Sequence, residues 1–349
     1  MTTWRLTEKD RELFSRDLES FVPPDIFDAH AHWYRTSHFP PNTAPDLVRN
    51  SPAATGAAVY LDAMARLLPG RRIEGLFFAY PHGMLNVGAA NQFVLSEVRG
   101  RLGSRANLLV RPQDDPDWIR EVVRQEGFAG LKCYHVYSNH RPTYESPIDD
   151  FLPESQVEVA HEEGLAITLH IVRSRALADP TNQDTIRRYC ELYPGIRLIL
   201  AHAGRGFNPH HTIQGVQALR GLPNLWFDTS AVTDSGAVEA ISRVFGTKRL
   251  LYGSDFPVSQ MRGRCVAVGD SFLWITAENT DLRAPYGRME LAYIGHESLR
   301  MLKVAALSLH WSDTDIENVF HNNARELFPL RSQERRALPA IKPPSDEVA

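Results

Sequence analysis

The feature that most constrains the fold of this chain is a repeated alternation of short apolar runs with longer amphipathic segments. Segments such as DDPDWIREVVRQEG at 114–127 have helical spacing of apolar residues, acidic residues near the start and a glycine at the end, as helices do. Strand and helix in steady alternation predict a parallel sheet covered by helices. The runs, rich in branched or aromatic residues, are found at 26–30, 73–80, 107–112, 128–134, 165–171, 196–202, 224–230 and 249–255.

Eight such strands in a chain of 349 residues fit an α/β fold of the (β/α)8, or TIM-barrel, type. The alternative is an open, doubly wound sheet, which usually carries a glycine-rich phosphate loop after its first strand. The sequence has AHAHWY at 29–34 in that place, so we favour the barrel. We expect an N-terminal helical lead-in at 1–24, the barrel at 25–330 and a flexible C-terminal tail at 331–349.

The alternation breaks down between Arg262 and Tyr293, after the eighth expected strand. The residues there follow no steady period. Long irregular segments in compact domains are often substrate loops or lids. We therefore expect an insertion, either a long loop or a helical segment, near the mouth of the barrel.

Composition excludes several functional classes. The formal net charge is -4 and there is no long basic run, so a nucleic-acid partner is not indicated. Three well-separated cysteines do not suggest a disulfide framework. The N-terminus shows no apolar signal core, and no apolar run approaches the roughly 20 residues of a membrane helix. We expect a cytoplasmic protein that acts on a small molecule without nucleic-acid or membrane partners.

Polar residues stand at or next to the ends of several apolar runs. His30 and His32 lie two positions apart, so both would project from the same face of a strand. Strand ends converge on one face of a barrel, which would bring distant residues together. Imidazole and carboxylate groups bind zinc at about 2.0–2.2 Å, and such a metal lowers the pKa of bound water toward about 7. The other residues of this pattern are Lys132, His170, His202 and Asp255.

Each of these residues also has an ordinary explanation when it is taken alone. A histidine at a strand end can be a hydrogen-bonded structural residue. Asp255 in Asp-Phe-Pro can cap a turn, and Lys132 can be a surface lysine. The joint pattern, rather than any single residue, predicts a metal site in which a nearby histidine or carboxylate acts as general base or acid.

The motifs DAHAH at 28–32, LH at 169–170, AHAG at 201–204 and YGSDFP at 252–257 together resemble a known group of enzymes. They are similar to the amidohydrolase superfamily, and within it to the amidohydrolase-2, or aminocarboxymuconate-semialdehyde decarboxylase-like, branch. NNARELF at 322–328 is similar to the C-terminal helix of that branch. The resemblance spans Phe27 to Leu330, nearly the whole chain.

The resemblance implies one divalent metal per chain, usually Zn²⁺, with Mn²⁺ or another divalent ion as an option. The residues expected to hold it are His30, His32, His170 and Asp255. His202 is expected beside the metal-bound water as a proton shuttle, and Asp255 is expected to share in proton transfer. Asp28 is expected to stabilise the turn or to support a ligand from outside the metal shell.

Three alternatives stay open for the number of metals and for the role of Lys132. In two-metal amidohydrolases a lysine on the fourth strand is carboxylated and bridges the metals, and GLKCYH at 130–135 suits that placement. An uncarboxylated Lys132 would instead contact substrate beside one metal, which is the arrangement we favour. Some lactonases of this fold work without metal, although they tend to lack part of the ligand set found here.

Arginines follow three of the expected strands and are candidates for binding a substrate carboxylate, because a guanidinium holds carboxylates bidentately. Arg173 and Arg205 are the stronger candidates, since they lie three residues beyond His170 and His202, while Arg111 follows the third strand. The alternative is that each arginine pairs with an acidic residue on the barrel rim. Other residues expected to face the pocket are His82 and Tyr134 or His135; His210 and His211 are assigned to a loop.

The expected activity is that of a metal-dependent hydrolase in which metal-activated water attacks a lactone, amide or related carbonyl of a small, carboxylate-bearing substrate. The alternative on the same site is nonoxidative decarboxylation of an unsaturated or aromatic carboxylic acid. A barrel without catalysis, used as a scaffold, would lack ligands, and none of the expected set is missing. The resemblance also favours a homodimer.

Overall fold

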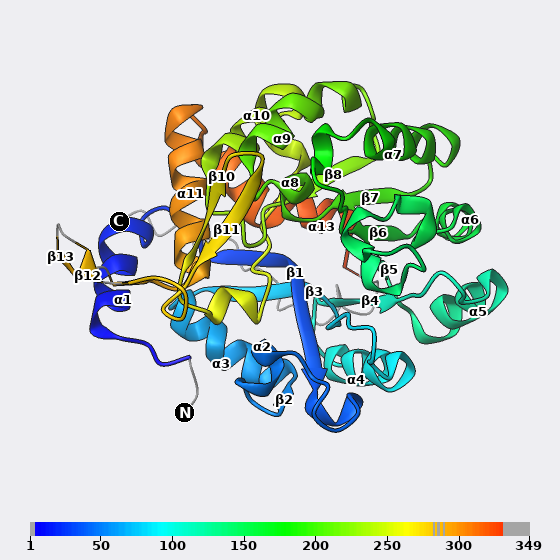
Figure 1. The fold of residues 1–349 in the computed structure, drawn as a ribbon, viewed down its shortest axis with the longest axis horizontal. Coiled ribbons are helices and arrows are strands. Elements are labelled where there is room, and N and C mark those ends of the chain that lie inside the picture. The colour runs from blue at the N-terminus through cyan, green and yellow to red at the C-terminus, as the bar shows by residue number, and fades with distance from the viewer. Residues whose placement is uncertain (1–3, 282, 285–286, 289, 331–349) are drawn as a thin grey trace, which may run out of the picture.

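The computed structural model describes residues 4–281, 283–284, 287–288 and 290–330, so the predicted tail at 331–349 lies outside the described residues. Its centre is a nine-stranded sheet in the order β2-β1-β3-β4-β5-β6-β7-β8-β9 (Figure 1). The strands are β1 (Asp25–Arg35), β2 (Ala54–Thr55), β3 (Arg72–Ala79), β4 (Arg105–Leu109), β5 (Gly130–Cys133), β6 (Ala166–Leu169), β7 (Arg197–Leu200), β8 (Leu225–Asp228) and β9 (Leu250–Leu251).

The sheet forms the predicted barrel. Its successive pairs from β1 and β3 through β8 and β9 are parallel, and the short β2 adds to β1 antiparallel. Each of the predicted apolar runs overlaps one of the parallel strands. Backbone hydrogen bonds join β1 to the segment after β9, from Ala29 N to Tyr252 O (2.8 Å) and from His32 N to Phe256 O (2.7 Å). The sheet therefore closes on itself, which confirms the fold class.

Helices cover the outside of the sheet, as α5 illustrates. Asp115 accepts hydrogen bonds from the backbone of Asp117 and Trp118, Pro116 occupies the first turn, and Gly127 follows with φ 79°. Its buried face is apolar. The longer helices are α3 (Ala57–Leu67), α4 (Val87–Val98), α5 (Pro116–Glu126), α6 (Glu154–Glu162), α7 (Pro180–Leu192), α9 (Pro209–Gly215), α10 (Ser235–Phe245) and α11 (Ile294–Ser308).

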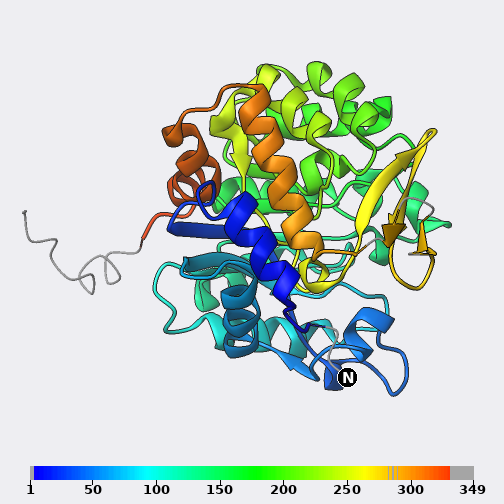
Figure 2. The ribbon, with the colours of Figure 1, turned by 90° about the vertical axis from the view of Figure 1, so that its left-hand side faces the viewer.

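Short helical segments complete the chain. Near the N-terminus, α1 and the π-helical turn that follows it lie beside α11 (Figure 2). Across the described residues, no helix combines the length and the apolar character that a membrane span requires. The short segments are α1 (Glu8–Leu13), the π turn Phe14–Leu18, α2 (Asp46–Arg49), α8 (His202–Arg205), α12 (Asp313–Glu317), the π turn Asn318–Asn322 and α13 (Asn323–Leu327).

The C-terminal helices cover the end of the barrel where the strands begin. Arg105 and Arg197, the first residues of β4 and β7, donate hydrogen bonds to the carbonyls of Pro329 (2.7 Å) and Leu327 (2.5 Å). The Phe328 ring stacks on Phe27 of β1, with centroids 5.7 Å apart. We call this the closed end of the barrel, defined by Phe27, Glu74, His321, Arg325 and Phe328.

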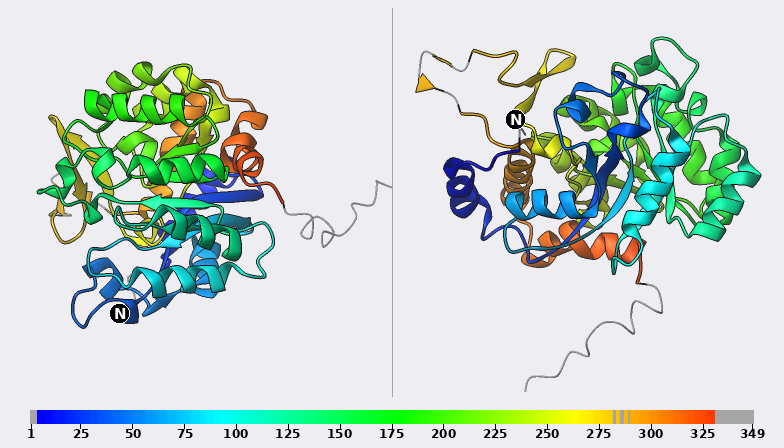
Figure 3. Two further views of the ribbon diagram at one scale, coloured as in Figure 1. Left: turned by 90° about the vertical axis from the view of Figure 1, so that its right-hand side faces the viewer. Right: turned by 90° about the horizontal axis from the view of Figure 1, so that it is seen from below.

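The insertion after β9 contains strands, which neither of its two expected forms, a long loop or a helical segment, included. β10 (Arg264–Val268) and β11 (Ser271–Ile275) form an antiparallel hairpin, and β12 (Arg283–Ala284) pairs with β13 (Gly287–Arg288). The period-two pattern was hidden because apolar side chains occupy both faces of the hairpin. The hairpin and α13 lie at opposite ends of the molecule (Figures 2 and 3).

Candidate active site

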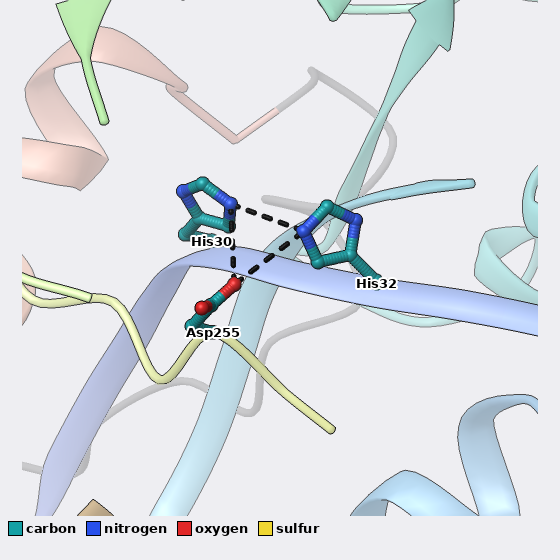
Figure 4. Close-up of side chains that lie close together, drawn as sticks. All are labelled: His30, His32 and Asp255. Atoms are coloured by element: carbon teal, nitrogen blue, oxygen red, sulfur yellow. Dashed lines mark hydrogen bonds and ion pairs between the residues drawn. The ribbon is translucent and has the colours of Figure 1, made fainter. Parts of the chain in front are cut away.

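Three potential metal ligands meet at the end of the barrel opposite α13. The Nε2 atoms of His30 and His32 on β1 are 3.2 Å apart. Asp255, which follows β9, places Oδ1 3.5 Å from the first of these nitrogens and 3.4 Å from the second (Figure 4). All three side chains are buried. We call this group the His-His-Asp cluster.

The ring orientations in the His-His-Asp cluster fit a divalent cation. His30 Nδ1 lies 2.8 Å from an oxygen of Asp228, and His32 Nδ1 lies 3.3 Å from the Ala79 carbonyl. Since both partners are acceptors, each Nδ1 carries the hydrogen, and each Nε2 is left with its lone pair toward Asp255. Burial lowers the pKa of both imidazoles, which keeps them neutral near pH 7.

Asp228, at the end of β8, orients the cluster and was missed in the sequence. Its second oxygen, Oδ1, accepts hydrogen bonds from the backbone N–H of His202 (3.0 Å) and of Ser230 (3.1 Å), and from the Ser230 hydroxyl. Burial opposes its ionisation, but His30, His202 and Ser230 outweigh that effect and hold its pKa below the ordinary value. The missed signal is the aspartate within the seventh apolar run, at 224–230, two residues before the end of that run.

Asp228 also belongs to a second group of close ligand atoms, with His30 and His202. Within that group, the short contact between His30 Nδ1 and Asp228 Oδ2 is a hydrogen bond. The Nε2 atom of the same ring faces the His-His-Asp cluster instead. We therefore assign Asp228 to orienting His30, a role that carboxylates commonly have behind metal-bound histidines.

Asp28 supports the cluster from beneath, as expected. Its carboxylate accepts hydrogen bonds from the backbone N–H of His30 (3.1 Å) and Ser254 (2.8 Å), and from the Tyr60 hydroxyl (2.7 Å). Burial raises the pKa of Asp28 to about 6. These bonds tie β1 to the segment that carries Asp255.

A left-handed turn directs His202 into the site. His202, Ala203 and Gly204 have φ of 55°, 53° and 69°, so α8 starts with left-handed backbone just after β7. Non-glycine residues in this region cost about 1–3 kcal/mol each and tend to cluster at functional sites. His202 Nδ1 lies 2.9 Å from the Ser230 carbonyl, which leaves Nε2 free to accept a proton. Burial lowers the pKa of His202, so the ring is neutral near pH 7.

His170 lies beside the cluster rather than within it. Its ring centroid is 5.0 Å from that of His202 and 4.7 Å from that of Tyr134. In the described part of the chain its buried Nδ1 has no hydrogen-bond partner. His170 is outside the groups whose ligand atoms all lie within 4.8 Å of one another. Its role as a metal ligand therefore stays a prediction, which the unpartnered nitrogen supports.

Lys132 is not a surface lysine. It is fully buried, with Nζ 3.3 Å from His30 Nε2 and 4.5 Å from the centre of the Phe78 ring. Burial lowers its pKa to about 8, which increases the fraction of neutral amine near pH 7. A neutral amine is the form that can take up carbon dioxide. The position is thus compatible both with a carboxylated lysine and with a lysine that contacts substrate.

The three candidate arginines differ in their partners. Arg111 pairs with Asp114 (2.7 Å), and Arg173 Nε lies 2.9 Å from an oxygen of Asp179. Arg205 donates to the Arg173 carbonyl (2.7 Å), and its guanidinium has no acidic side chain within 4.0 Å among the described residues. Burial lowers the pKa of Arg205. Arg205 is therefore the arginine left with capacity for a substrate carboxylate.

A cavity of about 270 Å³ opens over His32, His170, His202 and Asp255, whereas Lys132 and the three arginines are not among its lining residues. A larger hollow of about 450 Å³, beside α1 and residues 290–292, contains none of the candidate residues. Tyr134 lines the smaller cavity, as the sequence predicted, whereas His82 and His135 are not among its lining residues. The lining residues are His32, Tyr80, Pro81, Tyr134, His170, His202, Phe207, Asp255, Val258, Met261, Trp274 and Ile294.

Comparison with known proteins identifies the family. Residues 27–330 match the sequence model of the amidohydrolase family, so the chain belongs to that family. This match confirms the resemblance seen in the histidine and aspartate motifs, and it makes the protein an amidohydrolase-type enzyme.

Individual relatives are distant. The chain is 24% identical to an L-fucono-1,5-lactonase from Burkholderia ambifaria, over 71% of this chain and 84% of the relative. An amidohydrolase from Burkholderia multivorans with bound zinc superposes with a TM-score of 0.57 at 15% identity, covering 88% of this chain and 99% of the other. A 5-carboxyvanillate decarboxylase from Sphingomonas paucimobilis gives 0.53 at 14% identity, covering 88% and 100%. The two structures support the fold alone.

Proposed function

We propose that this protein is a metal-dependent hydrolase that opens a lactone or a related ester or amide. The observation that carries the proposal is the convergence of His30 Nε2, His32 Nε2 and Asp255 Oδ1 beneath a cavity. The distant similarity to a lactonase supports the choice of a cyclic ester. Zinc in the B. multivorans structure supports the choice of metal.

The residues proposed to hold the metal are His30, His32 and Asp255, with His170 as the fourth. Neutral imidazoles and one carboxylate are a donor set that Zn²⁺ favours, and Mn²⁺ also accepts it. A divalent cation in such a site polarises a carbonyl and makes water a better nucleophile at neutral pH. We favour one metal per chain, with Lys132 uncarboxylated.

His202 and Asp255 are proposed to move the protons. Hydrolysis forms a bond between the carbonyl carbon and the oxygen of water, and it breaks the bond to the ring oxygen. One proton must leave the water and one must reach the departing oxygen. His202 suits the first step because it lines the cavity, its Nδ1 is engaged by the Ser230 carbonyl and its ring is neutral. Asp255, which also lines the cavity, shares the transfer.

Arg205 is proposed to bind a carboxylate if the substrate carries one. Its side chain is half-buried, and its guanidinium lacks an acidic partner among the described residues. Arg173 is the weaker candidate because its guanidinium already forms an ion pair with Asp179.

A second candidate is nonoxidative decarboxylation. The aromatic cavity walls favour it, since Tyr80, Tyr134 and Phe207 suit a flat unsaturated acid. In that reaction the bond from the substrate carbon to its carboxylate breaks to release carbon dioxide, and a proton takes its place on the carbon. His202 would first take a proton from solvent water on Nε2 and would then pass it to that carbon.

One experiment separates these activities. Protein purified without added metal or chelator is analysed for metal per chain and then incubated with six-membered lactones and aromatic carboxylic acids. A product heavier by one water marks the hydrolase, and released carbon dioxide marks the decarboxylase. A His30→Ala/His32→Ala variant is the control, and it should lose both the metal and the activity.

The metal content is informative in itself. About one zinc or manganese per chain agrees with the proposal, and about two would assign Lys132 to a bridging carbamate. A metal-free protein that hydrolyses lactones at full rate, even after attempted reconstitution, would overturn the metal-dependent mechanism.

A further inference from the structure

We propose that the β10–β11 hairpin makes this site selective for substrates whose non-reacting part is an apolar or aromatic ring, with Trp274 as the selecting residue. The inference rests on the proposed hydrolase function and narrows its substrate class. It also separates this protein from enzymes that act on polyhydroxylated sugar lactones.

The hairpin presents one of its faces to the cavity. Cross-strand pairing sets Cys265 opposite Trp274 and Ala267 opposite Phe272, so these four side chains share a face. On that face Phe272 and Trp274 pack on Phe207, with ring centroids 5.1 and 5.5 Å away. Trp274 lines the cavity. The opposite face carries Leu273, which is 51% exposed.

The hairpin is attached to the barrel at its tip. Asn208, just before α9, donates hydrogen bonds from its side-chain amide to the carbonyls of Gly269 and Ser271, both at 3.0 Å. His211, which the sequence placed in a loop, lies in α9 and contacts Asp270 at 3.1 Å.

The hairpin is also attached at its base. The Thr233 hydroxyl donates to the Cys265 carbonyl (2.8 Å) and accepts from the Cys265 backbone N–H (3.1 Å). With both ends held, the hairpin forms a fixed wall of the cavity, and the position of Trp274 is set by the fold.

Away from the histidines and Asp255, the walls of the cavity are mainly apolar. They consist of aromatic rings together with the aliphatic or thioether side chains of Val258, Met261 and Ile294, and their polar side-chain groups are the hydroxyls of Tyr80 and Tyr134 and the indole N–H of Trp274. A polyhydroxylated substrate buried there would leave most of its hydroxyls without a hydrogen-bond partner, which is unfavourable. A flat ring would instead contact the faces and edges of Tyr134, Phe207 and Trp274. A volume of about 270 Å³ suits a molecule of one or two rings.

The test compares two six-membered lactones of similar size, 3,4-dihydrocoumarin and D-glucono-1,5-lactone, with the metal-loaded protein. We expect kcat/KM for dihydrocoumarin to exceed that for gluconolactone by at least about tenfold, after each is divided by its spontaneous hydrolysis rate. A preference for gluconolactone would overturn the inference.

Variants of β11 assign the preference to Trp274. Trp274→Ala should lower kcat/KM for dihydrocoumarin by about tenfold, mainly by raising KM, and should change gluconolactone hydrolysis by less than about threefold. Trp274→Phe keeps an aromatic wall and should retain most of the preference. It is the control for a displaced hairpin in the Trp274→Ala variant. Leu273→Ala is the matched control on the opposite face and should leave both rates unchanged. Equal losses on both lactones in Trp274→Ala and Trp274→Phe would contradict the assignment.

A binding measurement keeps this inference separate from the proposed hydrolysis. The probe is the lactam counterpart, 3,4-dihydro-2-quinolinone, titrated calorimetrically into metal-loaded wild-type protein and the Trp274→Ala variant. Weaker binding by the variant with no turnover of any lactone would support the apolar-ring selectivity and reject the hydrolase. Lactone hydrolysis with a sugar preference, and no effect of Trp274→Ala on lactam binding, would support the hydrolase and reject the selectivity.

Discussion

The two ends of the barrel use the same residue types for different purposes. At the closed end, Glu74 accepts a hydrogen bond from Arg325 Nε (2.9 Å) and lies 3.6 Å from His321 Nε2, so its charge is compensated. At the other end, His30 and His32 turn their lone pairs toward Asp255. Polar groups that satisfy one another stabilise a fold, whereas polar groups aimed at a common point are prepared for a ligand.

The ends also differ in backbone strain and in the placement of positive charge. His202 and Asp255 both adopt positive φ, and Lys132 is buried only 3.3 Å from a histidine nitrogen. The closed end instead packs the Phe27 and Phe328 rings in parallel. In barrels of this type the carboxyl ends of the strands carry activity and the amino ends carry stability. Substitutions at the two ends should therefore change different quantities.

The largest effect is expected from Asp255→Asn at the catalytic end. The amide keeps the size of the side chain but loses the charge and the ability to take a proton, so kcat/KM should fall by about 10³-fold. The melting temperature of the metal-free protein should change by only a few degrees. Steady-state kinetics and thermal melting measure the two quantities. The control is Asp117→Asn at the start of α5, whose side chain is 90% exposed and outside the cavity. An Asp255→Asn variant with activity within tenfold of wild type would remove Asp255 from the mechanism.

Phe328→Ala at the closed end should have the opposite profile. The ring is 3% exposed and stacks on Phe27, so its loss should cost about 3 kcal/mol of unfolding free energy. The kcat of the folded protein at 25 °C should stay within about twofold of wild type, because the change lies at the end opposite the site. Chemical denaturation measures the first effect and initial rates the second. A large loss of kcat with unchanged stability would show that the two ends are coupled.

Asp228→Asn tests whether a residue behind the cluster affects metal binding. An amide is a weaker acceptor for His30 Nδ1, so the metal dissociation constant should rise by about 10–100-fold. Competition with a chromogenic chelator measures it, and excess metal should restore most of the kcat. If the variant bound metal as tightly as wild type, Asp228 would have only a structural role.

The sequence predicted the barrel and several polar residues at the ends of its strands, because the patterns that indicate strands are local. Apolar runs and their terminal residues can be read over a few positions, and closure of a barrel brings those ends together. His30, His32, His202 and Asp255 were found in this way. Asp228 follows the same rule and was missed, because the aspartate is followed by Thr-Ser and was taken as part of the run.

What could not be predicted depends on packing between distant segments. No local pattern shows that Lys132 is buried against His30, or that His170 lies next to His202 and outside the close cluster. The hairpin was hidden because both of its faces are apolar, and its fold depends on anchors such as Asn208. The burial of Lys132, the position of His170 and the hairpin all depend on contacts between segments that are far apart in the sequence.

The smallest effect concerns the pH dependence of the closed end. The contact with the Glu74 carboxylate raises the pKa of His321 above its ordinary value of 6.5, although burial opposes this. A raised folded-state pKa stabilises the protein fully below the unfolded pKa, and the stabilisation disappears as pH rises through the folded pKa. His321→Gln should therefore lower the unfolding free energy by about 0.5–1 kcal/mol at pH 5.5 and by almost nothing at pH 8.5. Denaturation of metal-free protein at both values measures this difference without a contribution from metal binding. An equal loss at both pH values would mean that His321 acts through shape rather than charge. The catalytic rate measured at pH 8.5 should not change, since the substitution lies at the end of the barrel that holds the fold together.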